Sequence, residues 1–136
     1  MASAKLSNRQ IGAVGESVVT AALMRCGYSI LKPVEDYAGY DMVAEKDGRF
    51  VRIQVKTSAK QDARQNRYGF MTSAGCDKKS RYTKSMVDYI VCWAMDVDLF
   101  WVVKPSQCKG KNTKLDRKST RLNSSHVSES RMPSSA

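Results

Sequence analysis

The sequence predicts an α/β fold, and two patterns support this prediction. Apolar residues recur at helical spacing near the N-terminus, in residues 11–22. Farther along, runs of β-branched and aromatic residues alternate with turn residues, which is typical of strands. The chain has 136 residues, 42% of them hydrophobic, and can bury one core and hardly more. We therefore expect one folded domain that begins with a helix and continues as a sheet.

The first element is predicted to be an amphipathic helix. Ser7, followed three residues later by Gln10, is a capping-box signature for a helix N-terminus. Gly27 supplies the stop. The apolar residues that recur at helical spacing between these signals are Ile11, Val14, Val18 and Ala22.

A β-hairpin is predicted next. Two strand-like segments, residues 41–45 and 49–57, flank the dipeptide Asp47-Gly48, which is a strong signal for a two-residue turn. If this dipeptide occupies both turn positions, every step back along one strand matches a step forward along the other. Positions whose numbers sum to 95 are then cross-strand partners.

This register gathers three polar side chains on one face of the hairpin. Asp41 and Gln54 become partners, with Cβ atoms about 4.5–5.5 Å apart. Lys56 shares their face, because side chains alternate along a strand. An apolar core gains nothing from an acid, an amide and an ammonium together, so this edge is either solvated or a site. Carboxylate and amide oxygens suit Mg²⁺, and a nearby lysine can hold a phosphate or help to activate water.

The remaining elements are short. Residues 28–31 are predicted to form a strand or an extended entry to the sheet, and residues 68–72 a third strand. The polar residues 73–84 indicate a surface loop or a short helix. A last strand pair is predicted over residues 87–94 and 99–103, ending before Pro105.

Three of these segments together resemble a known family. A helix with an acid (GAVGE, ending in Glu16), an acid that opens a strand (YD, with Asp41) and the sequence QVK (Gln54 to Lys56) are similar to the core of the PD-(D/E)XK nucleases. The resemblance covers residues 9–105. Within the superfamily the chain is most similar to the group of cyanobacterial intron-encoded homing endonucleases, which carry glutamine in the QxK motif. Tyr40 stands where the motif's proline would precede the acid.

The resemblance implies a fold and a set of roles. The fold would be a restriction-endonuclease-like αβββαβ core, a mixed central sheet flanked by helices. Asp41 would bind the metal directly, Gln54 would supply a neutral oxygen ligand, and Glu16 would bind the metal or its water. Lys56 would position or deprotonate the attacking water and stabilise the phosphorane charge. The implied cofactor is Mg²⁺, with Mn²⁺ as a substitute, and Gln54 is expected to weaken metal affinity or to give Glu16 more importance.

Two of the assignments have plainer alternatives. Glu16 lies on the flank of the predicted helix, where a surface acid is equally ordinary without the family resemblance. A basic cluster is predicted to contact DNA phosphates, although such runs are usually solvated loops. This cluster consists of Lys78, Lys79, Arg81 and Lys84.

Composition narrows the function classes. The chain has 23 basic and 13 acidic residues, a formal charge of +10 that suits a polyanionic partner. No apolar run approaches the roughly 20 residues of a membrane helix, so we expect a cytoplasmic protein with no membrane partner. The cysteines show neither zinc-ribbon nor disulfide spacing and are expected to be ordinary thiols. They are Cys26, Cys76, Cys92 and Cys108.

The end of the chain is expected to be foreign. Residues 116–136, DRKSTRLNSSHVSESRMPSSA, resemble the translation of a sequencing-library adapter, and we expect an artefactual, disordered tail there. The nuclease-like domain then spans residues 1–115, with its native C-terminus truncated. His126, the only histidine, lies in the tail. Without the tail's four basic and two acidic residues, 19 and 11 remain, so the domain keeps a charge of +8.

The function expected from these observations is metal-dependent hydrolysis of double-stranded DNA by an endonuclease of homing or phage type. A catalytically silent DNA-binding module of the same fold is one alternative, and a junction resolvase or restriction-type subunit is another. Because one site cuts one strand, we expect a homo-oligomer, either a dimer or a tetramer.

Overall fold

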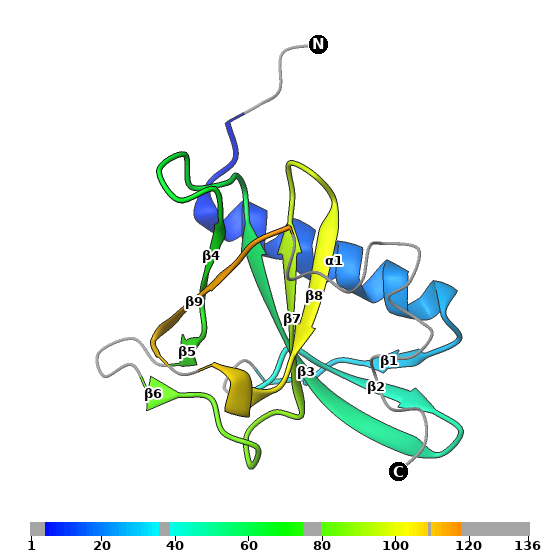
Figure 1. Ribbon diagram of the computed structural model, residues 1–136. Coiled ribbons are helices and arrows are strands. Elements are labelled where there is room, and N and C mark those ends of the chain that lie inside the picture. Colours follow the sequence, from blue (N-terminus) through cyan, green and yellow to red (C-terminus); the bar gives the residue numbers. More distant parts are fainter. Residues whose placement is uncertain (1–4, 36–38, 75–79, 109, 118–136) are drawn as a thin grey trace.

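The computed structural model describes residues 5–35, 39–74, 80–108 and 110–117 (Figure 1). One helix, α1 (Asn8–Arg25), precedes all the strands, and a short 3-10 helix, Pro105–Gln107, precedes the last one. The strands are β1 (Ser29–Leu31), β2 (Met42–Lys46), β3 (Arg49–Ser58), β4 (Tyr68–Met71), β5 (Ser73–Ala74), β6 (Ser80–Arg81), β7 (Tyr89–Ala94), β8 (Leu99–Val103) and β9 (Asn112–Leu115).

Helix α1 begins and ends as predicted. The Ser7 hydroxyl accepts a hydrogen bond from the Gln10 amide at 3.2 Å, and the Gln10 side chain accepts one from the Ser7 amide at 2.8 Å. This reciprocal capping box satisfies two amides that the first turn leaves without helical partners. Gly27, at φ 88°, follows the helix in a conformation that favours glycine. Within the described part of the chain, no helix combines the length and apolarity required to span a membrane.

The main sheet has five strands in the order β1-β2-β3-β7-β8. Its β3–β7 pair is parallel and its other pairs are antiparallel, so the predicted α/β class with a mixed sheet is confirmed. The β2–β3 register is also confirmed, since the pairs from Met42 with Ile53 to Lys46 with Arg49 all sum to 95. Asp47 (φ 54°) and Gly48 (φ 78°) form the turn, with the positive φ angles of a two-residue hairpin.

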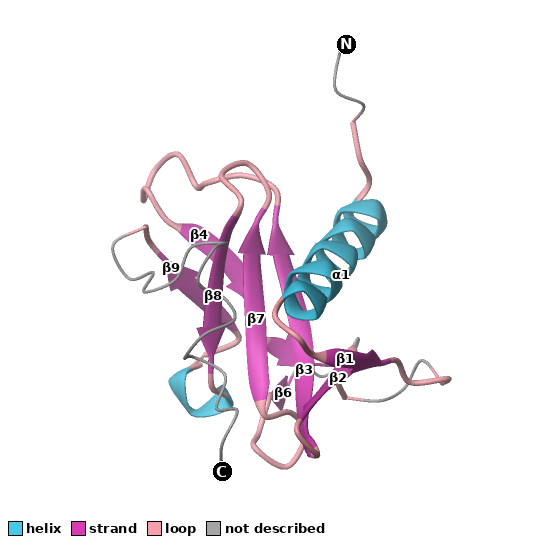
Figure 2. Ribbon diagram, turned by 90° about the vertical axis from the view of Figure 1, so that its right-hand side faces the viewer, coloured by secondary structure: helices cyan, strands magenta, loops and turns pink. Residues whose placement is uncertain are grey.

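Each face of the sheet carries its own apolar cluster. Helix α1 covers one face, where Ile53 and Val55 of β3 are buried together with Trp93 (Figure 2). On the other face, Ile90 and Cys92 of β7 pack in a second cluster with residues of β4 and β8. The buried members of this second cluster are Tyr68, Phe70, Tyr82, Val87, Ile90, Cys92, Ala94, Trp101 and Cys108.

The connection from β3 to β7 differs from the one that the family resemblance implies. The αβββαβ pattern places a second helix there, but the described residues between these strands contain none. Strand β4 pairs with β9 instead, and this ribbon lies across the sheet from α1 (Figure 2). The physical reason is the period of β4, in which Tyr68 and Phe70 are buried while the residues between and after them are exposed. The sheet is therefore flanked by a helix on one face and by strands on the other.

Helix α1 approaches β3 closely at Gly15. A Cβ atom added to Gly15 would lie 1.7 Å from the Thr57 hydroxyl oxygen and 3.0 Å from the Thr57 Cβ atom. Gly12, one turn earlier in the helix, has no atom within 4 Å of the equivalent position. Gly15 therefore sets the distance between the helix and the sheet, and it does so next to Glu16.

We predict opposite effects for alanine at these two glycines. Gly12→Ala should stabilise the protein by about 0.5–1 kcal/mol, because alanine restricts the unfolded chain and favours helix. Gly15→Ala should destabilise it by about 1–3 kcal/mol, because the new methyl group overlaps Thr57. Urea unfolding measures both, and Thr57→Ala should relieve part of the Gly15→Ala cost. Equal stability of the two single variants would contradict this packing.

Candidate active site

Asp41 lies at the end of the hairpin opposite the turn. Its amide donates to the Ile53 carbonyl at 2.8 Å, one residue out of register with the β2–β3 ladder, which ends at the pair of Met42 with Ile53. Its carboxylate accepts a hydrogen bond from the Val55 amide, also at 2.8 Å. Two bonds to β3 therefore fix both the backbone and the side chain of Asp41, and they hold the carboxylate against the strand that carries Gln54.

The charge on Asp41 is unfavourable in this position. Burial raises the pKa of the carboxyl above its ordinary value, and the nearby groups only partly offset the effect. These groups are the Val55 amide, the charges of Lys56 and Lys32, and a hydrogen bond with the Gln54 side chain. The Asp41 carboxylate is thus a partly buried anion that a further cation beside it would stabilise.

Gln54 and Lys56 lie on the face of β3 that points away from α1, as the alternation of the strand predicts. Gln54 hydrogen-bonds Asp41, and the charge of Lys56 acts on the same carboxyl. Across the parallel ladder, Gln54 pairs with Ile90 and Lys56 pairs with Cys92. Ile90 and Cys92 are fully buried. The structure therefore brings three of the four predicted site residues together at the margin of an apolar cluster.

Glu16, the fourth predicted residue, is half-buried on α1. It follows Gly15, which packs on Thr57 near the end of β3. One turn later, the Thr20 hydroxyl lies 3.8 Å from the sulfur of Met42, at the start of β2. These contacts place Glu16 on the part of the helix that crosses the Asp41 end of the hairpin, on the helix side of the sheet.

No group of three or more His, Cys, Asp and Glu side chains suited to a metal gathers anywhere in the described ranges. The predicted metal ligands include only two acids, Asp41 and Glu16, because the amide of Gln54 stands where a third acid would be.

Two residues near the site were not predicted. Tyr82 lies with its ring centroid 5.2 Å from the Lys56 ammonium. Burial, followed by the charge of Asp41, raises the pKa of the Tyr82 phenol to about 12. Lys32, just after β1, is the other residue, since its charge lowers the pKa of Asp41. Residues 78–85, KKSRYTKS, are otherwise basic or hydroxyl-bearing, so the local pattern does not predict a buried aromatic at Tyr82.

The predicted DNA-binding cluster is only partly described. Lys78 and Lys79 lie outside the described residues. The Arg81 guanidinium donates to the Cys108 carbonyl at 3.0 Å, and Lys84 is exposed. Lys84 therefore presents its side chain to solvent, whereas Arg81 ties β6 to the C-terminal part of the chain.

Arg52 fixes the segment that follows β6. Its guanidinium donates to the carbonyls of Ser85 (2.6 Å) and Lys84 (2.9 Å) and to the carboxylate of Asp88 (3.1 Å to Oδ2). Burial alone would raise the pKa of Asp88, but the hydrogen bonds and charge of Arg52 outweigh it and lower that pKa. Because Arg52 and Gln54 project from the same face of β3, this clamp secures the segment next to the candidate site.

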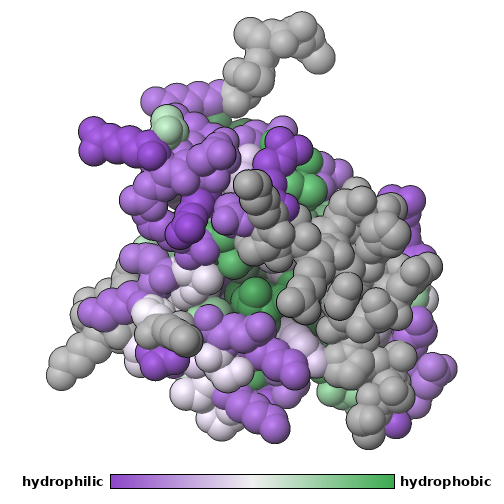
Figure 3. Space-filling model, viewed as in Figure 1, coloured by the Kyte–Doolittle hydropathy of each residue, from purple (hydrophilic) through white to green (hydrophobic). Residues whose placement is uncertain are grey.

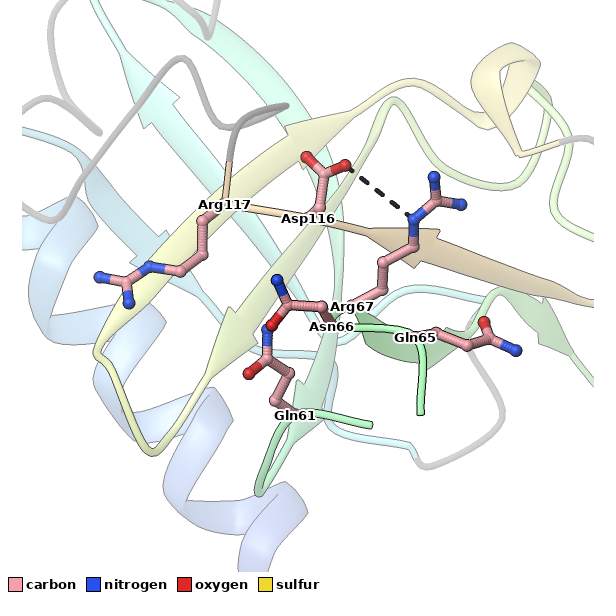
Figure 4. A pocket seen from close by; sticks show the side chains of 6 residues that line it. All are labelled: Gln61, Gln65, Asn66, Arg67, Asp116 and Arg117. Carbon is pink, nitrogen blue, oxygen red and sulfur yellow. Dashed lines mark ion pairs between the residues drawn. The ribbon is translucent and has the colours of Figure 1, made fainter. Parts of the chain in front are cut away.

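Of two pockets on the described surface, one borders the candidate site. One, of about 430 Å³, lies between the start of α1 and the end of β3 and includes Lys56 in its lining. The other, of about 420 Å³, contains none of the predicted site residues (Figure 4). Arg67 and Asp116 form an ion pair of 3.9 Å at its edge. On the face of the molecule in Figure 3, polar side chains cover most of the described surface.

A mixed sheet with a helix on one face and an acid, an amide and a lysine at the end of one hairpin defines a restriction-endonuclease-like core. The model of the PD-(D/E)XK endonuclease family matches residues 6–130. Protein 5.3 of Escherichia phage T7 is 32% identical over 114 residues, covering 76% of this chain and 91% of that protein. The chain therefore belongs to the PD-(D/E)XK endonuclease family.

A solved structure is similar as well. The bacterial homing endonuclease I-Ssp6803I matches with a TM-score of 0.73 at 22% sequence identity, covering 86% of this chain and 83% of that chain. This similarity confirms the predicted restriction-endonuclease-like α/β fold. Because the family match passes Leu115, the adapter origin of residues 116–136 stays a prediction.

We predict that Asp41→Asn stabilises the metal-free protein near neutral pH. The folded protein raises the pKa of Asp41, so folding disfavours its anion, and the cost is present above the folded pKa and absent below the unfolded one. Asparagine can still accept the Val55 amide. Thermal unfolding in EDTA should show a gain for Asp41→Asn that shrinks as the pH falls through the carboxyl range.

The control for this experiment is Glu35→Gln, which makes the same change in net charge at an exposed carboxylate. An Asp41→Asn variant that is less stable than the wild type at every pH would contradict the unfavourable burial of the Asp41 charge.

Proposed function

We propose that this protein is a metal-dependent endonuclease that hydrolyses phosphodiester bonds in double-stranded DNA. The observation that supports this most directly is the Asp41 carboxylate, which is held against β3 by the Val55 amide beside Gln54 and near Lys56. Burying a carboxylate beside an amide and an ammonium destabilises the folded protein, so stability alone does not explain this arrangement. Membership of the PD-(D/E)XK endonuclease family supports phosphodiester hydrolysis as the chemistry of this arrangement.

The residues present fit a hard divalent cation. Asp41 offers a carboxylate oxygen and Gln54 an amide oxygen, both preferred by Mg²⁺, which keeps several waters and needs few protein ligands. Burial raises the pKa of Asp41 and so disfavours its negative charge, which a bound cation would stabilise. Glu16 would hold the metal or one of its waters from the helix side, and Mn²⁺ would substitute for Mg²⁺. When bound, the ion supplies a Lewis acid that polarises the scissile phosphate.

The protein's own groups have separate tasks in this proposal. Asp41 orients the cluster, since its position is fixed by two bonds to β3. The Lys56 ammonium holds the attacking water or the phosphate and offsets the negative charge that develops on the phosphorane. Lys84, in the segment clamped by Arg52, contacts a DNA phosphate. We also propose a homo-oligomer, a dimer or a tetramer, because each site cuts one strand.

Nicking of supercoiled plasmid by the whole chain tests the proposal. We expect cutting in Mg²⁺ or Mn²⁺ and none in EDTA. Asp41→Ala and Lys56→Ala should each lower the rate by a factor on the order of 100 or more, because they remove a metal ligand and the charge that stabilises the transition state. Lys60→Ala, which removes an exposed lysine just beyond β3, should cut at the wild-type rate.

Other outcomes separate the alternatives. Tight binding to duplex DNA without cutting in either metal would replace the proposal by a catalytically silent DNA-binding module. Cutting confined to branched DNA would retain the chemistry and make the protein a junction resolvase. Cutting that survives Asp41→Ala would contradict the assignment of this site.

A further inference from the structure

Tyr82 has a position that ordinary core packing does not require. Its side chain is 6% exposed and belongs to the apolar cluster on the β4 side of the sheet. Yet the Lys56 ammonium lies over its ring, 5.2 Å from the centroid, and the Asp41 charge acts on its phenol. The ring of Tyr82 thus contacts the ammonium that the proposed chemistry uses and lies close to the carboxylate.

The segment that carries Tyr82 is held in place on both sides. Before it, the Arg81 guanidinium is bonded to the Cys108 carbonyl at 3.0 Å. After it, the Thr83 carbonyl accepts from the amides of Met86 (2.9 Å) and Val87 (3.1 Å). Arg52 then ties the Lys84 carbonyl and Asp88 to β3 itself. The ring therefore has a fixed position relative to β3, the strand that carries Lys56.

We infer that Tyr82 is a positioning residue for Lys56, whose ammonium it holds over its aromatic face on the side of β3 where Asp41 lies. The inference rests on the proposed function and deepens it. A lysine has four rotatable side-chain bonds, and an ammonium held against a ring loses much of that freedom before substrate arrives. A cation over a desolvated aromatic face is attracted by the ring quadrupole, which favours one arrangement of the lysine side chain. Lys56 would then meet the phosphate already oriented.

The chain contains a matched control for this contact. Tyr28 is 5% exposed, and the ammonium of Lys46 lies 5.1 Å from its ring centroid. Lys46 ends β2 beside the hairpin turn, whereas Asp41 precedes the other end of that strand. Replacing Tyr28 therefore removes a ring of similar burial and a cation contact of similar distance, away from the site.

The kinetic test compares Tyr82→Phe, Tyr82→Leu and Tyr28→Leu in plasmid nicking by the whole chain. Tyr82→Leu should lower the maximal rate at saturating protein about tenfold, within what one cation–π contact supplies, and change the half-saturating concentration by less than about twofold. Tyr82→Phe keeps the ring and should restore the rate. Tyr28→Leu should reduce stability but leave the maximal rate unchanged. Tyr82→Met replaces Tyr82→Leu if the latter does not fold.

A second measurement does not depend on cutting. In protein labelled with ¹³C-lysine, the ε-methylene protons of Lys56, assigned by their loss in Lys56→Arg, should be shifted upfield by the ring current of Tyr82. The Lys46 protons should be shifted by Tyr28 in the same spectrum. Tyr82→Phe should retain the Lys56 shift, whereas Tyr82→Leu should abolish it and leave that of Lys46.

The outcomes separate the inference from the proposed function. Unshifted Lys56 protons in the wild type, or a wild-type maximal rate in Tyr82→Leu, would overturn the inference. A wild-type protein that never cuts DNA, but whose Lys56 protons are shifted by Tyr82, would overturn the proposed function and with it the catalytic purpose of the contact. Equal loss of rate in Tyr82→Leu and Tyr82→Phe would also overturn the inference, because it would assign the effect to the hydroxyl.

Discussion

The candidate site depends on one constraint, the register of the β2–β3 hairpin. Asp47 and Gly48 adopt the positive φ angles that a two-residue turn requires, and this turn pairs Lys46 with Arg49. Every later pair follows from the first. At the far end the ladder stops at Met42 and Ile53, and Asp41 is held just beyond it, by its amide to the Ile53 carbonyl and by its carboxylate to the Val55 amide. A shift of one residue would turn Gln54 and Lys56 toward α1 and Ile53 and Val55 away from it.

Burial of the Asp41 carboxylate destabilises the folded protein. Burial raises the pKa of Asp41, so the site is less favourable to the folded protein than an uncharged one would be. Packing and hydrogen bonds elsewhere in the fold offset this destabilisation. Two apolar clusters form on opposite faces of the sheet, α1 packs closely on β3 through Gly15, and Arg52 clamps the segment before β7. A destabilising site supported by stabilising contacts elsewhere is expected where function requires a charge that folding disfavours.

The parts of the fold that could be predicted are those with local signals. The capping box of α1, its glycine stop and the Asp47-Gly48 turn each lie within a few residues, and they fixed the helix and the hairpin register correctly. The register in turn predicts Asp41, Gln54 and Lys56 on one face, although the observed ladder ends at Met42 with Ile53, one pair short of Asp41 with Gln54. What could not be predicted depends on contacts between distant segments. Tyr82 reaches Lys56 only because Arg52 and Arg81 hold its segment, and β4 pairs with β9, whose residues 112–115 carry no apolar run.

In the proposed function, Asp41 and Gln54 together bind a divalent cation. A crystal structure of the whole chain with Mn²⁺, using anomalous scattering to locate the ion, tests this claim most directly. We expect an anomalous peak within coordination distance of an Asp41 carboxylate oxygen and the Gln54 amide oxygen, and no peak there in Asp41→Asn. A Mn²⁺ ion bound elsewhere in a protein that cuts DNA, with this position empty, would contradict it.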